Sequence, residues 1–162
     1  MDTMENAPEI RIVTLPAMRV ASVHGFGQGP ELLAWEKLEA WAGPKGYLDD
    51  RAAHPIYGFN NPNPSPGSPN YGYEYWMKVE PDETPTDDVR IVDFDGGLYA
   101  VMRCPVHDNP DTEIPRTWKR LVTWREQSAY RRGTHQWLEE HLAVDEPGEH
   151  FTLDLYLPIA AS

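Results

Sequence analysis

Short stretches in which hydrophobic and polar residues alternate recur along the chain, and this alternation predicts β-strands. In the N-terminal half, the predicted strands are residues 10–13, 19–23, 56–60 and 71–79. In the C-terminal half, they are residues 89–94, 98–106, 136–142 and 151–159. The stretch 136–142 also has good helix propensity, so its assignment as a strand depends on the repeat described below.

Two longer stretches carry apolar residues at helical spacing and predict helices. The first opens at Gly29-Pro30-Glu31, where proline suits the first helical position and an acid suits the first turn. Its predicted inner face carries Leu32, Trp35, Leu38 and Ala42. The second helix has Thr112 as its predicted N-cap and Pro115 in its first turn. Its predicted inner face carries Ile114, Trp118, Leu121 and Val122.

The two halves of the chain repeat one pattern. Residues 10–13 recur as 89–92, residues 35–41 as 118–124, and residues 74–79 as 154–159. The offsets are 79, 83 and 80 residues, and chance matches would not keep this order and register. The pattern predicts an α+β fold in which one unit of strands and a main helix is duplicated.

The repeat predicts a single domain over residues 1–162, with a first unit at 8–80 and a second at 89–160. Residues 80–88 contain five acids and two prolines, which favours a solvated linker between the units. Residues 60–70 contain four prolines, and two interpretations stay open for them: a stiff flap over the cleft, or an ordinary surface connection.

The net charge of −12 argues against direct nucleic-acid binding, because such binding requires a basic surface that replaces counterions on phosphate. Acids outnumber bases by 26 to 14. This field favours cationic small molecules or a basic protein partner, although simple solubility explains it equally well. No motif predicts an oligomeric state.

A cytoplasmic location is predicted. The acidic N-terminus does not resemble a secretory signal, and no apolar run approaches the roughly 20 residues that cross a bilayer. The single cysteine, Cys104, lies in an apolar stretch and is predicted to be a small core residue.

The order of these motifs resembles the GyrI-like family of effector-binding domains, which includes the AraC-type activators. The resemblance rests on the opening stretch ending at Leu15-Pro16, the Trp-x-x-Leu-x-x-Trp helix, and the stretches 137–142 and 155–159. It covers residues 10–159 and implies an α+β fold of two pseudo-twofold β-α-β-β units, with antiparallel sheets and two main helices around a central cleft. In that family, the cleft is a pocket for aromatic, often cationic compounds. The resemblance also implies a stand-alone member, and some such members resemble hydrolases of cyclopropane-bearing genotoxins.

The resemblance implies that Glu139 is the glutamate that contacts the ligand from the penultimate strand. His141 stands where the family usually has tyrosine. Alternation along a strand places Trp137, Glu139 and His141 on one face, which we predict to face the ligand. Leu138 and Leu142 are then predicted to form the core layer against a helix.

The last strand of each half adds further candidate ligand-binding residues. Alternation places Asp154 and Tyr156 on one face of the final strand, and Glu74 and Trp76 on the equivalent face of the first half. We predict that Glu74, Trp76, Tyr156 and Glu139 line a shared cleft, where aromatic rings stack on a flat ligand and a carboxylate pairs with its charge. The alternative is that the acids are solvated and the aromatics are ordinary packing.

Three classes of function follow. The first is a sensor or sequestering protein for aromatic, cationic, drug-like compounds, with regulation of a protein partner as an extension. The second is a hydrolase in which Glu139 acts as a general acid or base and Tyr156 donates a hydrogen bond to developing charge. The third is haem carriage, for which His24, His54 and His141 are the candidate ligands.

No metal or cofactor is predicted. His135, Glu139 and His141 suggest a two-histidine, one-carboxylate site. Residues six apart on a strand, however, lie about 20 Å apart, which no single ion bridges. The glycines at 25, 27 and 29 precede a helix but lack the lysine and hydroxyl residue of a phosphate-binding loop, so a simple strand-to-helix turn is predicted.

Overall fold

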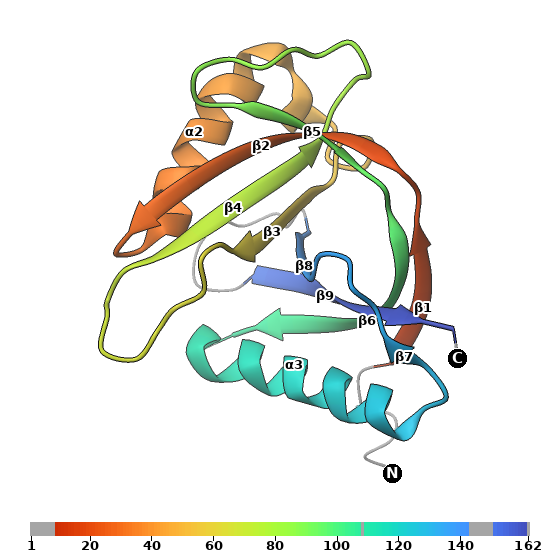
Figure 1. Ribbon diagram of the computed structural model, residues 1–162. Helices are drawn as coiled ribbons and strands as arrows, with labels where there is room; N and C mark the ends of the chain where they lie inside the picture. The colour runs from red at the N-terminus through yellow and green to blue at the C-terminus, as the bar shows by residue number, and fades with distance from the viewer. Residues whose placement is uncertain (1–8, 108, 143–150, 162) are drawn as a thin grey trace. The chain divides into compact units, whose positions relative to one another are not determined.

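The computed structural model describes residues 9–107, 109–142 and 151–161 (Figure 1). Its contacts divide the chain into two compact units. Residues 17–95 form the first, which we call the middle unit, and the described residues of 1–16 and 96–162 form the second, which we call the terminal unit.

The middle unit is an antiparallel sheet of four strands with a helix on one face. Its strands are β2 (Met18–Gly27), β3 (Ile56–Asn60), β4 (Tyr71–Lys78) and β5 (Arg90–Phe94). They pair in the order β3-β4-β2-β5. Helix α2 (Pro30–Lys45) packs on β2 and β4 and is followed by the short 3₁₀ helix η1 (Tyr47–Asp49).

The terminal unit has the same design. Its strands are β1 (Ile10–Leu15), β6 (Gly97–Val106), β7 (Arg131–Arg132), β8 (Leu138–His141) and β9 (Phe151–Ala160). The order is β1-β6-β9-β8, and β7 pairs with the end of β9. Helix α3 (Pro110–Gln127) packs on β6 and β9. The stretch predicted to be a strand at 136–142 is therefore a strand, although it is only four residues long.

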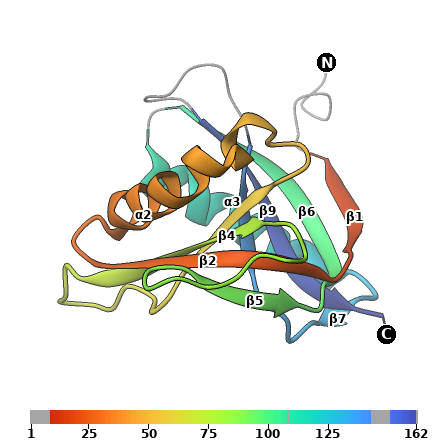
Figure 2. The ribbon, with the colours of Figure 1, turned by 90° about the horizontal axis from the view of Figure 1, so that it is seen from above.

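The two sheets correspond strand for strand, since β5-β2-β4-β3 repeats the order β1-β6-β9-β8. This confirms the duplicated α+β fold with antiparallel pairing and two main helices. The repeats nevertheless exchange their opening strands. Strand β1, from the first repeat, pairs with β6, and β5, from the second repeat, pairs with β2 (Figure 2).

The inner face predicted for α2 is partly wrong, because Leu32 is 63% exposed. The buried residues of the helix are Pro30, Ala34, Leu38 and Ala42. The reason is the close approach of the helix to Gly25 on β2, where an added Cβ would lie 2.5 Å from the Pro30 carbonyl oxygen and 2.9 Å from the Ala34 nitrogen. Such close contact leaves room only for small side chains at the start of the helix. The row from Pro30 to Ala42, with members four residues apart, therefore faces the sheet, and Leu32 faces outward.

Helix α3 begins two residues before the predicted N-cap. Pro110 takes the first helical position and Asn109 is the N-cap, so Thr112 lies inside the first turn. The Glu113 carboxylate accepts hydrogen bonds from the backbone N–H groups of His107 and Asn109 at 3.0–3.2 Å, which satisfies donors ahead of the helix. The predicted inner face is confirmed: Leu121 is fully buried and Ile114, Trp118 and Val122 pack against the core.

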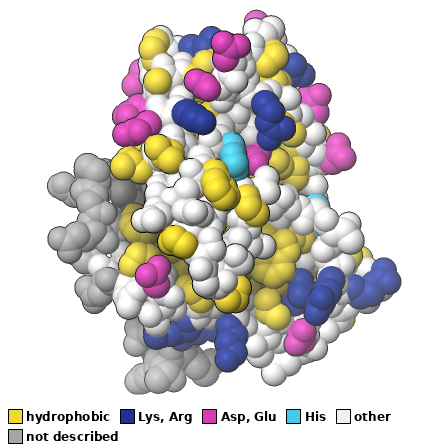
Figure 3. Space-filling model, turned by 60° about the vertical axis from the view of Figure 1, so that its left-hand side comes forward, with side chains coloured by type: hydrophobic (Ala, Val, Ile, Leu, Met, Phe, Trp, Pro, Cys, Tyr) yellow, Lys and Arg dark blue, Asp and Glu magenta, His cyan; other side chains and the backbone are white. Residues whose placement is uncertain are grey.

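Residues 80–88 form neither helix nor strand. Most are exposed, but Glu83 is an exception because its carboxylate accepts a hydrogen bond from the Tyr47 hydroxyl at 2.5 Å. Burial, together with this bond, raises the pKa of Tyr47 to about 12. Acidic and basic side chains both appear on the molecular face drawn in Figure 3, with hydrophobic side chains between them. Among the described residues, no helix has the length and apolar character to span a bilayer.

The two leucines of α2 provide a test of this packing. Leu38 is fully buried, so we expect Leu38→Ala to lower the free energy of unfolding by about 2–5 kcal/mol through lost burial and a residual cavity. Leu32→Ala, the same substitution at an exposed site of the same helix, should change it by less than about 0.5 kcal/mol. Urea unfolding followed by tryptophan fluorescence measures both; equal losses would contradict the orientation of α2.

Candidate functional site

Each sheet has one face covered by its own helix, and buried acids lie on the opposite face, which we call the distal face. On β4, Tyr73 and Tyr75 pack in the core with α2, so Glu74 and Trp76 point to the distal face. On β9, the row that begins with Leu153 packs in the core with α3, so Asp154 and Tyr156 point to the distal face. The predicted alternation of both strands is confirmed.

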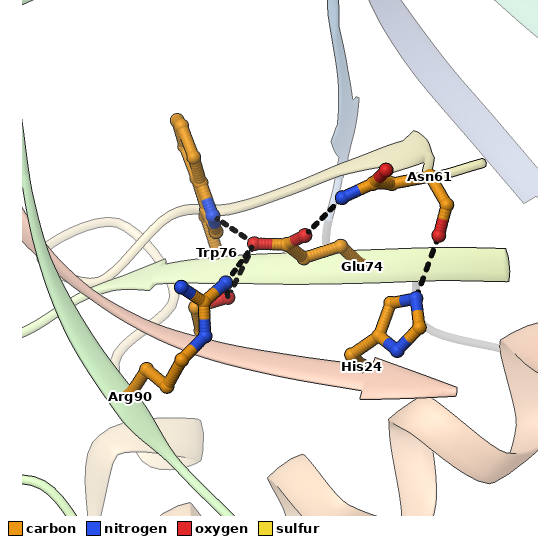
Figure 4. Close-up of polar contacts among 6 residues, drawn as sticks. His24, Asn61, Glu74, Trp76 and Arg90 are labelled. Atoms are coloured by element: carbon orange, nitrogen blue, oxygen red, sulfur yellow. Dashed lines mark hydrogen bonds and ion pairs between the residues drawn. The ribbon is translucent and has the colours of Figure 1, made fainter. Parts of the chain in front are cut away.

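Glu74, on the distal face of the middle unit, is 3% exposed and has both carboxylate oxygens engaged (Figure 4). Its Oε2 accepts hydrogen bonds from the Ser22 hydroxyl at 2.5 Å and Trp76 Nε1 at 2.8 Å. Arg90 Nη2 lies 3.1 Å from the same oxygen, and Asn61 Nδ2 donates to Oε1 at 3.0 Å. Donors from β2, β4, β5 and the loop after β3 thus converge on one carboxylate, which ties these elements together.

The proline-rich loop at 60–70 is anchored at its start by this group of residues. Asn61 contributes its side chain to Glu74, and its carbonyl oxygen lies 2.6 Å from His24 Nε2 (Figure 4). The residues that follow, 62–70, are exposed. Whether this loop covers a ligand stays a prediction.

Asp154 occupies the equivalent position in the terminal unit and is also 3% exposed. Arg103 donates from Nε to Oδ1 at 2.9 Å and from Nη2 to Oδ2 at 3.2 Å, so it grips the carboxylate with two hydrogen bonds. Arg11 Nη2 donates to Oδ2 at 2.9 Å. Burial acts to raise the pKa of Asp154, but the bonds from Arg103 and Arg11 outweigh it and hold the pKa below its ordinary value.

Arg11 and Arg90 are equivalent residues of the repeat, and each lies on an exchanged opening strand. Arg90 on β5 pairs with Glu74, and Arg11 on β1 pairs with Asp154. Each repeat therefore supplies the arginine that neutralises the buried carboxylate of the other.

A second acid, Glu140 on β8, lies on the same distal face as Asp154. It stands opposite Asp154 in the pairing of β8 with β9, and it accepts a hydrogen bond from the Tyr156 hydroxyl at 2.6 Å. Burial raises the pKa of Glu140 above its ordinary value, although the bond from Tyr156 and the charges of Arg11 and Arg103 act to lower it. Tyr99 completes the surroundings, with its ring edge-to-face with Tyr156 at 5.4 Å between centroids.

The predicted orientation of β8 is wrong. Glu139 stands opposite Leu155, so it lies on the face that α3 covers and does not share a face with Tyr156. Trp118 Nε1 of α3 donates to Glu139 Oε2 at 3.4 Å. Leu138, predicted to pack against a helix, instead stands opposite Tyr156 and is buried on the distal side. Alternation identified the residues that share a face, but only the register with β9 determines which face meets the helix.

Trp137 and His141 also lie apart from Tyr156. Trp137 is 41% exposed and contacts the Trp118 ring at 5.1 Å between centroids. His141 stands opposite Leu153 on the face of Glu139 and is half-buried. Ligand binding by Glu139, Trp137 and His141 stays a prediction.

Several residues of the distal faces were not selected from the sequence. Glu140 is itself a half-buried carboxyl bonded to Tyr156, and Arg11, Arg103, Ser22 and Asn61 each donate to a buried carboxylate. One signal was available, since an arginine recurs at the same position of the repeat, at 11 and 90. Asn61 carried no such signal because a loop brings it to Glu74.

The histidines considered for haem or metal binding are separated in the structure. His24 contacts Asn61, while His54 Nδ1 lies 2.9 Å from the Lys78 carbonyl oxygen and its ring packs edge-to-face with Tyr47. His135 Nε2 lies 2.7 Å from the Leu98 carbonyl oxygen. Within residues 9–107, 109–142 and 151–161, no three histidine, cysteine or acidic side chains are grouped to hold a metal ion.

Comparison with known proteins places this fold in a family. A family model described as integron-associated effector binding protein, Cass2, matches residues 11–159. No curated protein matches the chain.

Similar solved structures share the fold at low sequence identity. An uncharacterized conserved protein from Listeria innocua is 18% identical, with a TM-score of 0.69 over 98% of this chain and 97% of that one. A hydrolase from Listeria innocua is 16% identical, with a TM-score of 0.67 over 98% and 96%. EcmrR, solved in a complex with DNA, is 10% identical with a TM-score of 0.69; the match covers 99% of this chain but only 61% of the EcmrR chain.

The lowered pKa of Asp154 predicts a pH-dependent stability difference. Its ionised form contributes stability that is present above the ordinary aspartate pKa of about 3.9 and is lost as the pH falls through the lower folded-state pKa. Asp154→Asn leaves two half-exposed arginines without their carboxylate, so we expect a loss of about 1.5–3 kcal/mol at pH 7, the scale of hydrogen bonds to charged groups. The difference in free energy of unfolding between the wild type and Asp154→Asn should become smaller below about pH 4.

Urea unfolding at pH 7 and at several values below pH 4 measures this gap. Asp82→Asn, in the exposed segment 80–88, is the matched control and should follow the wild type at every pH. A gap that stays constant with pH would contradict the charged state assigned to Asp154.

Proposed function

Because the chain belongs to the family of integron-associated effector binding proteins, a GyrI-like family, we propose that it binds an aromatic, positively charged small molecule on the distal face of the terminal unit. Glu140 is the carboxylate that meets the positive charge, and the ring of Tyr156 contacts the aromatic part. The observation that carries this proposal is the half-buried, Tyr156-bonded carboxyl of Glu140 beside an aromatic pair.

Glu140 is better suited to this role than the two buried acids near it in the fold. Glu74 and Asp154 already receive arginine and other donors, so they have no capacity left for a ligand cation. Glu140 accepts a hydrogen bond from a neutral hydroxyl and has no ion pair within the described residues that would compete. A half-buried carboxylate attracts a cation more strongly than a solvated one because water screens it less.

The aromatic residues of the distal faces support a flat ligand. Tyr99 and Tyr156 lie edge-to-face in the terminal unit, and Trp76 lies between Phe59 and Phe94 in the middle unit, with ring centroids 4.9 and 5.3 Å away. Tyr99 is fully buried and Tyr156 is 6% exposed, so Tyr99 supports the Tyr156 ring from within the fold, and a ligand would meet only the small exposed part of Tyr156. Glu74 and Trp76, together with Glu139, Trp137 and His141, remain the binding residues that the sequence alone favoured.

A binder of this kind acts as a stand-alone sensor or sequestering protein. Binding withdraws a compound from solution, and a protein partner that recognises the ligand-bound state would turn binding into regulation. The net charge of −12 favours accumulation of cations near the surface and a basic partner, and it disfavours direct contact with nucleic acid.

The two adjacent glutamates of β8 provide a matched pair of variants. With (2-naphthylmethyl)trimethylammonium as the probe, Glu140→Gln should weaken binding by about ten-fold, the scale of one partly desolvated cation–carboxylate contact. Glu139→Gln, on the face covered by α3, should bind within about two-fold of the wild type. Isothermal titration calorimetry measures both. If Glu139→Gln lost affinity for the probe and Glu140→Gln retained it, Glu139 would be the carboxylate that binds the cation.

The raised pKa of Glu140 predicts how binding varies with pH. Only the ionised carboxyl attracts a cation, so affinity for the permanently charged probe should fall as the pH is lowered through a pKa above the ordinary glutamate value of about 4.3. Affinity for the neutral analogue 2-naphthylmethanol should stay flat, and Glu140→Gln should remove the dependence. Titrations from pH 4 to pH 8 test this, and equal pH dependence of both probes would contradict it.

The same pair of residues favours a second candidate function, hydrolysis of a reactive, cyclopropane-bearing compound. A carboxyl with a raised pKa can donate a proton to a leaving atom, and Tyr156 can stabilise charge that develops on an adjacent oxygen while water attacks. Product formation by catalytic amounts of protein, lost in Glu140→Gln, would support the enzyme. Stoichiometric quenching of tryptophan fluorescence without product would support the binder alone.

A further inference from the structure

The terminal unit contains one more cation than its buried carboxylate requires. Asp154 is held by both Arg11 and Arg103, so two guanidinium groups share one buried carboxylate. The side chains of Arg11 and Arg103 are 44% and 55% exposed, whereas that of Asp154 is 4% exposed. Both guanidinium groups are therefore partly exposed around a buried carboxylate, and an ionised Glu140 beside it balances the second positive charge.

The middle unit shows that the second arginine is not a requirement of the fold. His24 stands opposite Glu74 where Arg103 stands opposite Asp154. There, Arg90 alone neutralises the carboxylate, and neutral donors from Ser22, Asn61 and Trp76 complete its hydrogen bonding. In the corresponding sheet of the middle unit, a single arginine with neutral donors is thus sufficient to satisfy the buried carboxylate. Arg103 is an addition specific to the terminal unit.

The two arginines are also held in place with donors to spare. Their bonds to Asp154 occupy Nε and Nη2 of Arg103 and Nη2 of Arg11. Nη1 of Arg103 and both Nη1 and Nε of Arg11 take no part in these bonds to Asp154. A guanidinium group offers five donors in a rigid plane, and a group that is already oriented loses little entropy when it binds a carboxylate.

Glu140 lies beside this pair, because it stands opposite Asp154 in the pairing of β8 with β9. One distal face thus offers an acidic group, two oriented arginines and the small exposed part of Tyr156, whose ring packs on the buried Tyr99. A simple cation would use only part of this surface.

We propose that Arg11 and Arg103 form a binding site for an acidic group, so that the ligand class is an aromatic zwitterion carrying both a carboxylate and a protonated amine. This inference rests on the proposed function, because the same face binds the ring and Glu140 meets the amine. Arg11 and Arg103 are specificity-determining residues for the carboxylate.

Three probes that share a naphthalene ring system separate the contribution of the ligand carboxylate from that of the ligand amine. They are 2-naphthoate, 2-naphthylmethylammonium and 6-(aminomethyl)-2-naphthoate, titrated calorimetrically into the full chain at pH 7. We expect the zwitterion to bind about ten-fold more tightly than either singly charged probe. Arg103→Gln should weaken binding of the two carboxylate probes by roughly ten-fold or more, the scale of a charge-assisted hydrogen bond, and leave the ammonium probe within two-fold.

Arg120→Gln is the matched control, because it removes the same charge from α3 without touching Asp154. It should bind all three probes as the wild type does. Where thermal melting shows that Arg103→Gln does not fold, Arg103→Lys keeps the charge but not the planar fork, and it should still weaken binding of the carboxylate probes several-fold.

The outcomes distinguish the two proposals. If none of the three probes binds, the proposed function itself fails. If the ammonium probe binds and loses affinity in Glu140→Gln, but the zwitterion gains nothing over it or Arg103→Gln leaves the carboxylate probes unchanged, only the acidic-group site is overturned. Equal losses in Arg103→Gln and Arg120→Gln would also overturn it, because the effect would then come from net charge.

Discussion

A carboxylate buried within a β-sheet must be matched by cations or N–H donors, and this requirement determines much of the present structure. Removing one partner of a buried pair costs about 3–5 kcal/mol, a large share of the 5–15 kcal/mol that keeps a typical domain folded. Glu74 and Asp154 meet the requirement with arginines on β5 and β1, which come from the opposite repeat. The position of each opening strand is thereby coupled to the charge balance of the sheet beside it.

The two sheets neutralise their buried carboxylates differently, and the proposed function rests on this difference. In the middle unit, one arginine and three neutral donors satisfy Glu74, which leaves a neutral and closed group of residues. In the terminal unit, two arginines hold Asp154 and an additional glutamate lies beside them. The duplicated halves thus differ: a single arginine with neutral donors satisfies one carboxylate, and two arginines with a neighbouring glutamate surround the other.

Much of the fold could be predicted from the sequence, because alternation, helical spacing and the internal repeat each report local geometry. The strands, both helices and the alternation of β4 and β9 follow from these patterns. The prediction failed where a tertiary contact determined the result. The close approach of α2 at Gly25 turned Leu32 outward, and the register of β8 against β9 placed Glu140, in place of Glu139, on the distal face. No local pattern reports a register between strands.

The reciprocal exchange of β1 and β5 has a consequence for how such a chain could arise. A single repeat would lack the arginine-bearing edge of its own sheet, and two identical copies would each have to lend a strand to the other. Fusing such a domain-swapped homodimer end to end yields the topology observed here. After fusion, the two copies can accumulate different substitutions, so one half can keep its original charge balance while the other acquires different charged residues.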